Sequence, residues 1–265
     1  MQTITDLERV AAAHWRGTEE EWLGDWLLRA AGGFTGRANS ALPLGDPGLP
    51  LDDALAVVTR WYRDRGLPPM IALPVPLAAG DARAAGPRET DGPGRELDEQ
   101  LAQRSWPART GPAFFMVADL PLAIPAHGLA EGQLVRVSPE PDDAWAARYH
   151  YRGQDHLPTV ARQVLTSARE QSFVSIRNGG EVLAIARLSA VAGWAGLTAV
   201  EVHPGHRRRG LGRAITATAC RVAEQRGIPR VFLQVEVDNV PAQALYRRLG
   251  FRYSHRYHYR VAPSV

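Results

Sequence analysis

Apolar residues recur with two different periods in the second half of the chain, and each period predicts a different element. Residues 197–202, LTAVEV, form a short apolar run that ends at Pro204 and Gly205, as a buried strand does. Residues 211–226 instead carry apolar side chains at helical spacing, in one stripe made of Leu211, Ile215, Ala219 and Val222. The chain therefore predicts a strand, a turn and an amphipathic helix in direct succession.

The C-terminal segment 251–260 alternates between two faces. One face holds Phe251, Tyr253, His255, Tyr257 and Tyr259, and the other holds Arg252, Arg256, His258 and Arg260. Basic and aromatic side chains also occur together where proteins bind single-stranded nucleic acid. Strict alternation is more typical of a half-buried strand, so we expect a strand here.

Segments of the first half match segments of the second half in the same order, which predicts a tandem duplication. The matching pairs are residues 26–44 with 173–191, 60–75 with 221–236, and 101–118 with 246–262. In the second pair, both copies predict a helix, a glycine C-cap and a short strand. Loop-like segments rich in Pro lie at 76–96 and 120–132.

The chain is therefore expected to form two α/β domains, residues 1–120 and 133–265, joined by a linker over residues 121–132.

The copies differ at the turn before the helix. The first copy has DPGLPLDDALA and the second has HPGHRRRGLGRA. An acidic turn without arginines cannot hold a polyphosphate in the same way, so only the C-terminal half is expected to perform chemistry.

Composition narrows the class of protein. The chain has 265 residues, of which 45% are hydrophobic and 22% charged, as in soluble globular proteins. No apolar run reaches membrane-spanning length, the first residues do not resemble a signal peptide, and Cys220 is the only cysteine. These features predict a cytoplasmic protein without a membrane partner. All 31 basic residues are arginine, but the net charge is only +3, so nucleic acid is not indicated as a partner.

The turn between the predicted strand and helix combines several features of a phosphate site. Gly210 and Gly212 allow a ligand to approach the backbone, and a helix start offers N–H groups and the positive end of its dipole. Four arginines surround it, namely Arg207, Arg208, Arg209 and Arg213. A solvated arginine cluster beside an ordinary glycine turn is the simpler alternative.

The longer pattern R-x-x-G-x-G, following a strand that ends in V-x-P, resembles the pyrophosphate-binding signature of the GNAT superfamily of acyl-CoA N-acyltransferases. It is neither a Walker loop nor a Rossmann fingerprint. The family's next motif is matched by LQVEVDNVPAQALYRRLGF, residues 233–251. The resemblance covers roughly residues 133–262. It implies a mixed, mostly antiparallel sheet flanked by helices, with the N-terminal half as a second, degenerate copy.

The resemblance also implies acetyl-CoA as co-substrate. The residues that it assigns to acetyl-CoA are Val200, Val202, Arg207, Arg208, Arg209, Gly210, Leu211, Gly212, Arg213 and Asn239. Val202 N–H is the candidate donor to the thioester oxygen, on a strand that is splayed in the family. For Asn239, a role as the cap of the following helix is the alternative.

Two residues are candidates for proton transfer. Tyr246 matches the family's usual general acid for the leaving thiolate, and a core aromatic at this helix position is the alternative. Glu201 is the acid nearest the expected thioester and is the candidate base. A strand carboxylate paired with an arginine is its alternative, and Glu236 and Asp238 are competitors for the role.

His203 and His206 raise the question of a metal. No cysteine or carboxylate lies at ligand spacing from them and arginines adjoin them, so no metal is expected. The resemblance makes residues 141–163 a wall of the acceptor pocket. Its aromatic and acidic residues, which would suit a cationic amine, are Trp145, Tyr149, Tyr151, Asp142, Asp143 and Asp155.

The sequence therefore predicts an N-acetyltransferase that moves an acetyl group from acetyl-CoA to a primary amine by direct attack on the thioester. The expected acceptor is a small molecule, with a protein N-terminus as a second option, and the expected state is a monomer or homodimer. A non-catalytic acyl-CoA-binding regulator and a nucleic-acid-binding protein are the alternatives.

Overall fold

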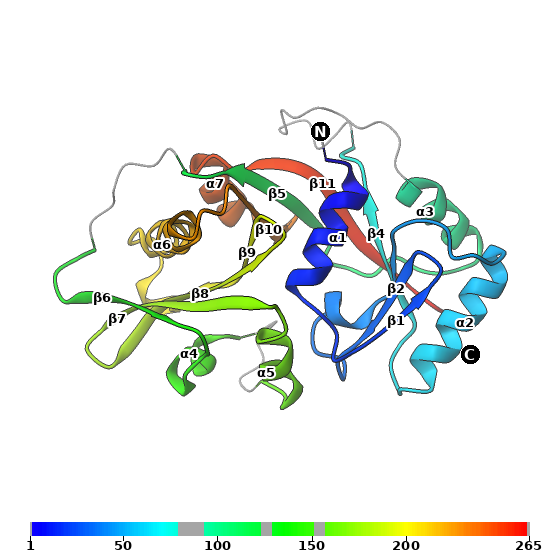
Figure 1. Ribbon diagram of the computed structural model, residues 1–265, viewed down its shortest axis with the longest axis horizontal. Coiled ribbons are helices and arrows are strands. Elements are labelled where there is room, and N and C mark those ends of the chain that lie inside the picture. Colours follow the sequence, from blue (N-terminus) through cyan, green and yellow to red (C-terminus); the bar gives the residue numbers. More distant parts are fainter. Residues whose placement is uncertain (1, 79–92, 123–128, 151–156, 264–265) are drawn as a thin grey trace.

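The computed structural model describes residues 2–78, 93–122, 129–150 and 157–263 of the chain (Figure 1). The elements of the first half are α1 (Ile4–His14), β1 (Glu19–Leu23), β2 (Trp26–Ala30), η1 (Arg37–Asn39), β3 (Leu42–Pro43), α2 (Leu51–Arg63), β4 (Met70–Val75), α3 (Pro93–Gln103) and β5 (Ala113–Asp119). The first helix begins at a capping box, in which the side chains of Thr3 and Asp6 each accept the other residue's backbone N–H.

The second half continues with a longer series of elements. In chain order these are β6 (Gln133–Ser138), α4 (Asp143–Arg148), α5 (Val160–Leu165), β7 (Glu170–Asn178), β8 (Glu181–Val191), β9 (Trp194–Val202), η4 (Pro204–His206), α6 (Leu211–Gln225), β10 (Arg230–Glu236), α7 (Val240–Arg248) and β11 (Arg252–Val261). The predicted strand, turn and helix are confirmed as β9, η4 and α6.

One large sheet carries most of these strands, in the order β4-β11-β5-β10-β9-β8-β7-β6. All neighbours are antiparallel except β9 and β10, which are parallel. Helix α6 packs on one face, against Ala184 and Leu188 of β8, while α4 and α5 pack on the other, around Ile185. The expected mixed, mostly antiparallel sheet with flanking helices is confirmed. A second, small sheet has the order β1-β2-β3.

The two halves of the chain exchange strands within the large sheet. Strand β5 lies between β10 and β11, and β11 lies between β5 and β4, so that the red C-terminal strand runs beside the cyan β4 in Figure 1. By position in its half, β4 corresponds to β10 and β5 corresponds to β11. Exchanging each strand for its counterpart gives the same order, β4-β11-β5-β10, read from the opposite end. The division at residues 121–132 stays a prediction, and strand pairing crosses it.

The matched helix ends adopt the same cap. Gly66 after α2 and Gly227 after α6 both have positive φ, +63° and +71°. The following residue then donates its N–H five residues back, from Leu67 to Tyr62 at 3.0 Å and from Ile228 to Ala223 at 3.1 Å. This is the Schellman arrangement that the paired glycines predicted.

One of the matched segment pairs is out of register. Strands β1, β2 and β3 form an antiparallel meander that leads into α2, just as β7, β8 and β9 lead into α6. The counterpart of β2 is therefore β8, and matching residues 26–44 with 173–191 was wrong by one strand. The Gly-Gly steps misled the comparison, because the turn after Asn178 closes a hairpin whereas Gly32 and Gly33 lead towards η1.

The alternating C-terminal segment is the strand β11, as expected, but Ser254 interrupts its alternation with a bulge. Tyr253 lies opposite Met116 of β5, and His255 lies opposite Phe115. Because Met116 and Phe115 are adjacent residues of β5, their side chains point to opposite faces of the sheet. The side chains of Tyr253 and His255 therefore also lie on opposite faces. The prediction of a single aromatic face is therefore wrong. The tyrosines farther along β11, Tyr257 and Tyr259, are buried and cannot stack on bases, which favours the strand interpretation over nucleic-acid binding.

Candidate active site

Strands β9 and β10 part in the middle of the sheet. Their parallel pairing ends at Leu197 and Leu233, after which β10 continues against β5 alone. The last residues of β9 pair only with β8, past a one-residue bulge at Ala199 and Val200, where Ala199 has φ +50°. The splay that the family resemblance implied is therefore present in β9.

The backbone of Val202 faces the splay. The next residue, His203, donates its N–H to Leu183 of β8 at 2.8 Å. Because successive residues of a strand direct their backbone groups to opposite sides, Val202 N–H and C=O point away from β8. The Val202 carbonyl accepts Arg207 Nε at 3.4 Å. This orientation suits a donor to a thioester oxygen, and that role stays a prediction.

The arginine turn joins this strand to α6. Its backbone uses positive φ twice, +60° at Arg208 and +82° at Gly210, which is the N-cap of the helix. Left-handed residues at a helix start turn N–H groups towards one point, which is the arrangement of an anion nest. No acidic residue lies in the first turn of α6, and Gly210 provides no side-chain cap. The geometry therefore fits the predicted pyrophosphate site.

The other residues of the turn contribute in different ways. Arg207, Arg208 and Arg209 are exposed and Arg213 is half-buried. Gly212 has a packing reason that the sequence did not reveal, because a Cβ there would lie only 3.1 Å from Leu245 Cδ2 on α7.

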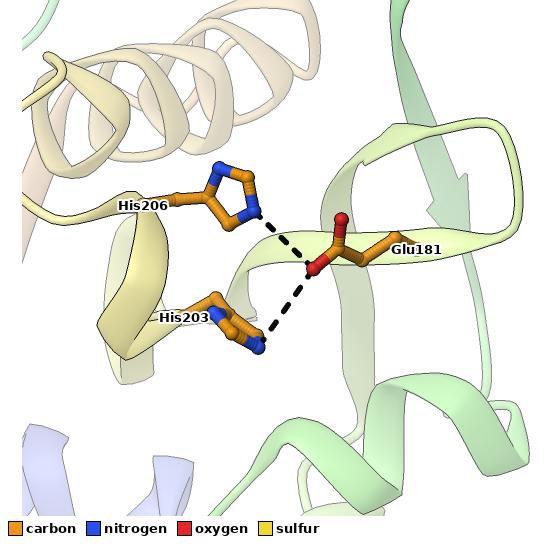
Figure 2. Close-up of side chains that lie close together, drawn as sticks. All are labelled: Glu181, His203 and His206. Carbon is orange, nitrogen blue, oxygen red and sulfur yellow. Dashed lines mark hydrogen bonds and ion pairs between the residues drawn. The ribbon is translucent and has the colours of Figure 1, made fainter.

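Glu181, at the start of β8, lies between the two histidines of the turn (Figure 2). Its Oε1 is 3.2 Å from His206 Nε2 and 3.7 Å from His203 Nε2. Each of the three side chains offers one ligand atom, all within 4.8 Å, so the fold supplies the carboxylate that the sequence spacing lacked. However, His203 Nδ1 accepts Gly205 N–H at 3.0 Å, which keeps the proton of the neutral ring on Nε2, the atom a metal would need. We interpret the cluster as polar contacts that connect the β7–β8 hairpin to the turn. The expected absence of a metal stays a prediction.

Tyr246 lies inside the core that covers the α6 face of the sheet. Its side chain is 7% exposed and makes an edge contact with Phe251, at 5.7 Å between ring centroids. Burial raises the pKa of the phenol above its ordinary value. The same core includes Val200 and Val202 of the splayed strand. Tyr246 is thus a packed aromatic in the core that Val200 and Val202 border, and its role as an acid stays a prediction.

Asn239 is the N-cap of α7, where its Oδ1 accepts Ala242 N–H at 3.2 Å. The cap interpretation is therefore confirmed, whereas a contact with acetyl-CoA stays a prediction.

Glu201 lies on the face of β9 opposite to Val200 and Val202, since side chains alternate along a strand. Both of its oxygens accept from His150, Oε2 from the backbone N–H and Oε1 from ring Nδ1, each at 2.8 Å. Its partner is thus a histidine, and pairing with an arginine was wrong. The competing acids, Glu236 and Asp238, are exposed.

The comparisons with known proteins agree with this geometry. The model of the family described as "Probable histone acetyltransferase Rv0428c C-terminal" matches residues 2–260. The chain belongs to this family. It is 31% identical to the probable histone acetyltransferase Rv0428c of Mycobacterium tuberculosis over 266 residues, which cover 99% of this chain and 75% of that protein. It is also 26% identical to the uncharacterized N-acetyltransferase YobR of Bacillus subtilis over 270 residues, 98% of this chain and 99% of YobR.

Solved structures place the fold in the GNAT class. A GCN5-related N-acetyltransferase from Kribbella flavida superposes with a TM-score of 0.68 at 20% identity, covering 99% of this chain and 95% of that one. A tandem GNAT protein from the clavulanic acid biosynthesis pathway gives 0.65 at 17% identity, covering 85% and 76%. In this GNAT chain, none of the described helices is both long and apolar enough to cross a bilayer.

Two residues of the predicted acceptor wall, Trp145 and Asp142, have structural roles. Trp145 is fully buried and donates to Val174 O at 3.1 Å, while Asp142 caps α4 and binds Arg177 at 2.8 Å. These two side chains are therefore committed to the fold, whereas the expectation that this segment lines a pocket for a cationic amine stays a prediction. Tyr151 and Asp155 lie outside the described residues.

Two residues of the site were missed from the sequence, His150 and Glu181. His150 lies 51 residues from its partner Glu201, and Glu181 lies 25 residues from His206. The only available signal was that His150 belongs to the segment expected to line the acceptor pocket. Pairs at such separations are fixed by strand register rather than by local spacing.

Proposed function

We propose that this protein transfers an acetyl group from acetyl-CoA to a primary amine. One observation carries the proposal, the splay between β9 and β10 immediately before an arginine-rich turn with left-handed backbone at a helix start. This arrangement offers an anion site for a pyrophosphate. At the end of β9 it also offers the Val202 N–H, which points away from β8, as a donor for a carbonyl oxygen.

The residues divide the proton transfers between the two sides of β9. The amine nitrogen attacks the thioester carbonyl carbon, and Val202 N–H stabilises the oxygen as it gains charge. Glu201, with His150, takes the proton that the nitrogen loses. When the carbon–sulfur bond breaks, Tyr246, on the other side of the strand, protonates the thiolate. Acid and base then act on opposite sides of the carbonyl without competing for one proton.

The N-terminal half is proposed to be a tandem copy that does not hold acetyl-CoA. The first turn of its equivalent helix, α2, contains Asp52 and Asp53, which repel an anion at that helix start. Asp52 also binds Arg104 at 2.6 Å.

The proposed acceptor is the amine of a small molecule, with a protein N-terminus as the second option, and the proposed location is the cytoplasm. The proposed assembly is a monomer or homodimer, without nucleic acid or membrane as a partner. Relatives are named for quite different acceptors, including streptothricin and the alanine of ribosomal protein bS18.

A titration of the purified protein with acetyl-CoA by calorimetry tests the donor site. We expect micromolar affinity in the wild type and no measurable binding in Gly210→Asp, because a carboxylate would stand in the anion nest at a residue whose φ is +82°. Gly180→Asp is the matched control, since it lies in an exposed turn with nothing within 4 Å of an added Cβ. Equal affinity in a folded Gly210→Asp protein would refute the placement of the site.

A screen of amines for release of the CoA thiol then tests the reaction. Turnover with at least one primary amine supports the transferase. Tight binding of acetyl-CoA without turnover of any amine would instead favour the acyl-CoA-binding regulator.

A further inference from the structure

A guanidinium from the N-terminal half reaches the splay in the C-terminal half. Arg37, in η1, donates through Nη1 to the side chain of Gln234 on β10. Gln234 is the first residue of β10 beyond its last parallel pair with β9, so Arg37 stands where the two strands part. Its side chain is only partly exposed.

A second guanidinium, Arg187 on β8, lies close to the same place and is completely buried. Within the described part of the chain its acceptors are all neutral, and they include the Thr198 hydroxyl at 3.3 Å and the carbonyl of His14 at 3.1 Å. Thr198 is the first residue of β9 beyond the last parallel pair. The two arginines therefore mark both sides of the splay.

The guanidinium groups of Arg37 and Arg187 both lie near the ring of Trp15. The guanidinium carbon of Arg37 lies 4.8 Å from the centroid of its ring, and that of Arg187 lies 5.2 Å from it. Among the described residues, no carboxylate forms an ion pair with either arginine. Burial, followed by the charge of Arg37, lowers the pKa of Arg187 to about 9, so the Arg187 guanidinium remains charged at neutral pH. A pair of poorly hydrated positive charges without an anion is costly unless a ligand supplies one.

The arginine pair and Glu201 face the same side of the sheet. Thr198 lies opposite Arg187 and Glu201 lies opposite Ile185, two residues along β8 and therefore on one face. At a rise of about 3.4 Å per residue, the two levels are separated by roughly 7 Å. The level of Arg187 and the level of the proposed base are thus only about two residues apart along β8.

We propose that Arg37 binds an anionic group of the acceptor, a carboxylate or a phosphate, while the amine of the same molecule lies at Glu201. This inference rests on the proposed function and names its substrate class, amines that carry an anionic group several bonds from the nitrogen. Arg37 makes the direct contact with the anionic group. The positive charge of Arg187, which lies near the same Trp15 ring, adds a longer-range electrostatic attraction. Simple polyamines are disfavoured, because their second ammonium would meet two positive charges.

The test compares amines with and without the anionic group. The pairs are 5-aminopentanoate with pentylamine and O-phosphoethanolamine with ethanolamine, assayed by thiol release with the wild type, Arg37→Gln, Arg37→Lys and Arg252→Gln. Arg252 is the matched control, because it is exposed in a surface ion pair with Asp119. The preference for the carboxylate pair or the phosphate pair tells the two anions apart.

We expect the wild type to prefer the anionic member of one pair by at least about tenfold in kcat/KM. Arg37→Gln should lose about 10- to 100-fold for that amine and a clearly smaller factor for the neutral amine. Arg37→Lys should retain part of the preference, and Arg252→Gln all of it. Equal kcat/KM within both pairs, or an equal loss for anionic and neutral amines in Arg37→Gln, would overturn the proposal.

A binding measurement separates this proposal from the reaction itself. The CoA-saturated protein is titrated with the same four amines by calorimetry. If no amine is turned over, but an anionic amine binds the wild type and not Arg37→Gln, the transferase proposal fails and the anion site stands. If all four bind alike, or Arg37→Gln binds like the wild type, the anion site is wrong.

Discussion

At the scale of single residues, burial and partnership separate the proposed catalytic groups from the structural ones. Glu201 is held by His150 through both oxygens and keeps a fifth of its side chain exposed, 19%. A carboxylate that is oriented but still accessible can accept a proton from a bound amine. The sequence placed Asn239 and Asp142 near the site, but their side-chain oxygens act as N-caps of helices.

Replacing Tyr246 by Phe tests the proposed acid. We expect unchanged affinity for acetyl-CoA and a kcat lowered by about 10- to 100-fold, since only the proton donor is removed. Steady-state kinetics and an acetyl-CoA titration check this. Tyr253→Phe is the matched control, because its hydroxyl donates to Gln243 Oε1 at 2.9 Å. An unchanged kcat in Tyr246→Phe would make Tyr246 a packing residue against Phe251.

His14 links the stability of the fold to pH. Its ring lies between α1 and the sheet, 2.8 Å from the Ser189 hydroxyl and in edge contact with Phe232. Burial, with the charge of Arg187 as the second cause, lowers the pKa of His14 from 6.5 to about 4.

The unfolded state therefore binds the proton more readily, and stability should fall as the pH decreases from 6.5 towards 4. This residue should cost about 2 kcal/mol of unfolding free energy between pH 7 and pH 5. Urea denaturation at both pH values checks it, and His14→Gln should flatten the dependence by that amount. The same pH dependence in wild type and variant would contradict the assignment.

At the scale of elements, the backbone conformations at strand and helix ends shape the site. The bulge at Ala199 and Val200 turns β9 away from β10, and the left-handed residues Arg208 and Gly210 turn the chain into α6. Neither device needs a specific side-chain contact. Both are local departures from regular geometry at the place where a ligand is proposed to bind, as is common at functional sites.

The helix caps offer a test of the repeated architecture. Gly66→Ala and Gly227→Ala should each cost about 1 kcal/mol of unfolding free energy, because a Cβ is strained at positive φ. Neither position has any atom within 4 Å of the added Cβ, so strain alone should act, and the two losses should be alike and additive. Gly180→Ala, equally open but without positive φ, is the control and should cost little. Chemical denaturation measures all three, and clearly unequal losses would contradict equivalent caps.

At the scale of the molecule, the two halves depend on each other for their sheets. Without β5, strands β10 and β11 would lose a partner that contributes seven paired positions to β10 and five to β11. Arg37 adds a functional dependence, because the N-terminal half reaches the splay of the C-terminal half. If Arg37 binds the acceptor as proposed, the N-terminal half contributes to the site even though it is not proposed to hold acetyl-CoA.

Separating the halves tests this dependence. A fragment of residues 129–265 should be insoluble or unfolded, since it would leave buried strand edges unpaired. Co-expression with residues 1–122 should restore a soluble complex with the circular dichroism of the intact chain. A fragment 129–265 that is soluble and unfolds cooperatively alone would contradict the prediction.

Some parts of the structure could be predicted from the sequence and others could not. The strand, turn and helix around residues 197–226 and both glycine caps were predictable, because period and backbone preference act over a few residues. The bulge at Ser254 was not, since it depends on which residues of β5 lie opposite β11. Gly212 was assigned to ligand approach, whereas its packing against Leu245 required the placement of α7.

Local chemistry in the chain was sufficient for the family resemblance and the position of the arginine turn, because each is encoded within a short continuous segment. The mixed sheet was expected only because the resemblance implied it. The exchange of β5 and β11, the pairing of Glu201 with His150 and the meeting of Arg37 with Arg187 at Trp15 came from the folded molecule. Some of these contacts join residues far apart in the sequence, such as Trp15 and Arg187, which are 172 positions apart. No local preference encodes such contacts, and they exist only after burial has fixed the register of the shared sheet.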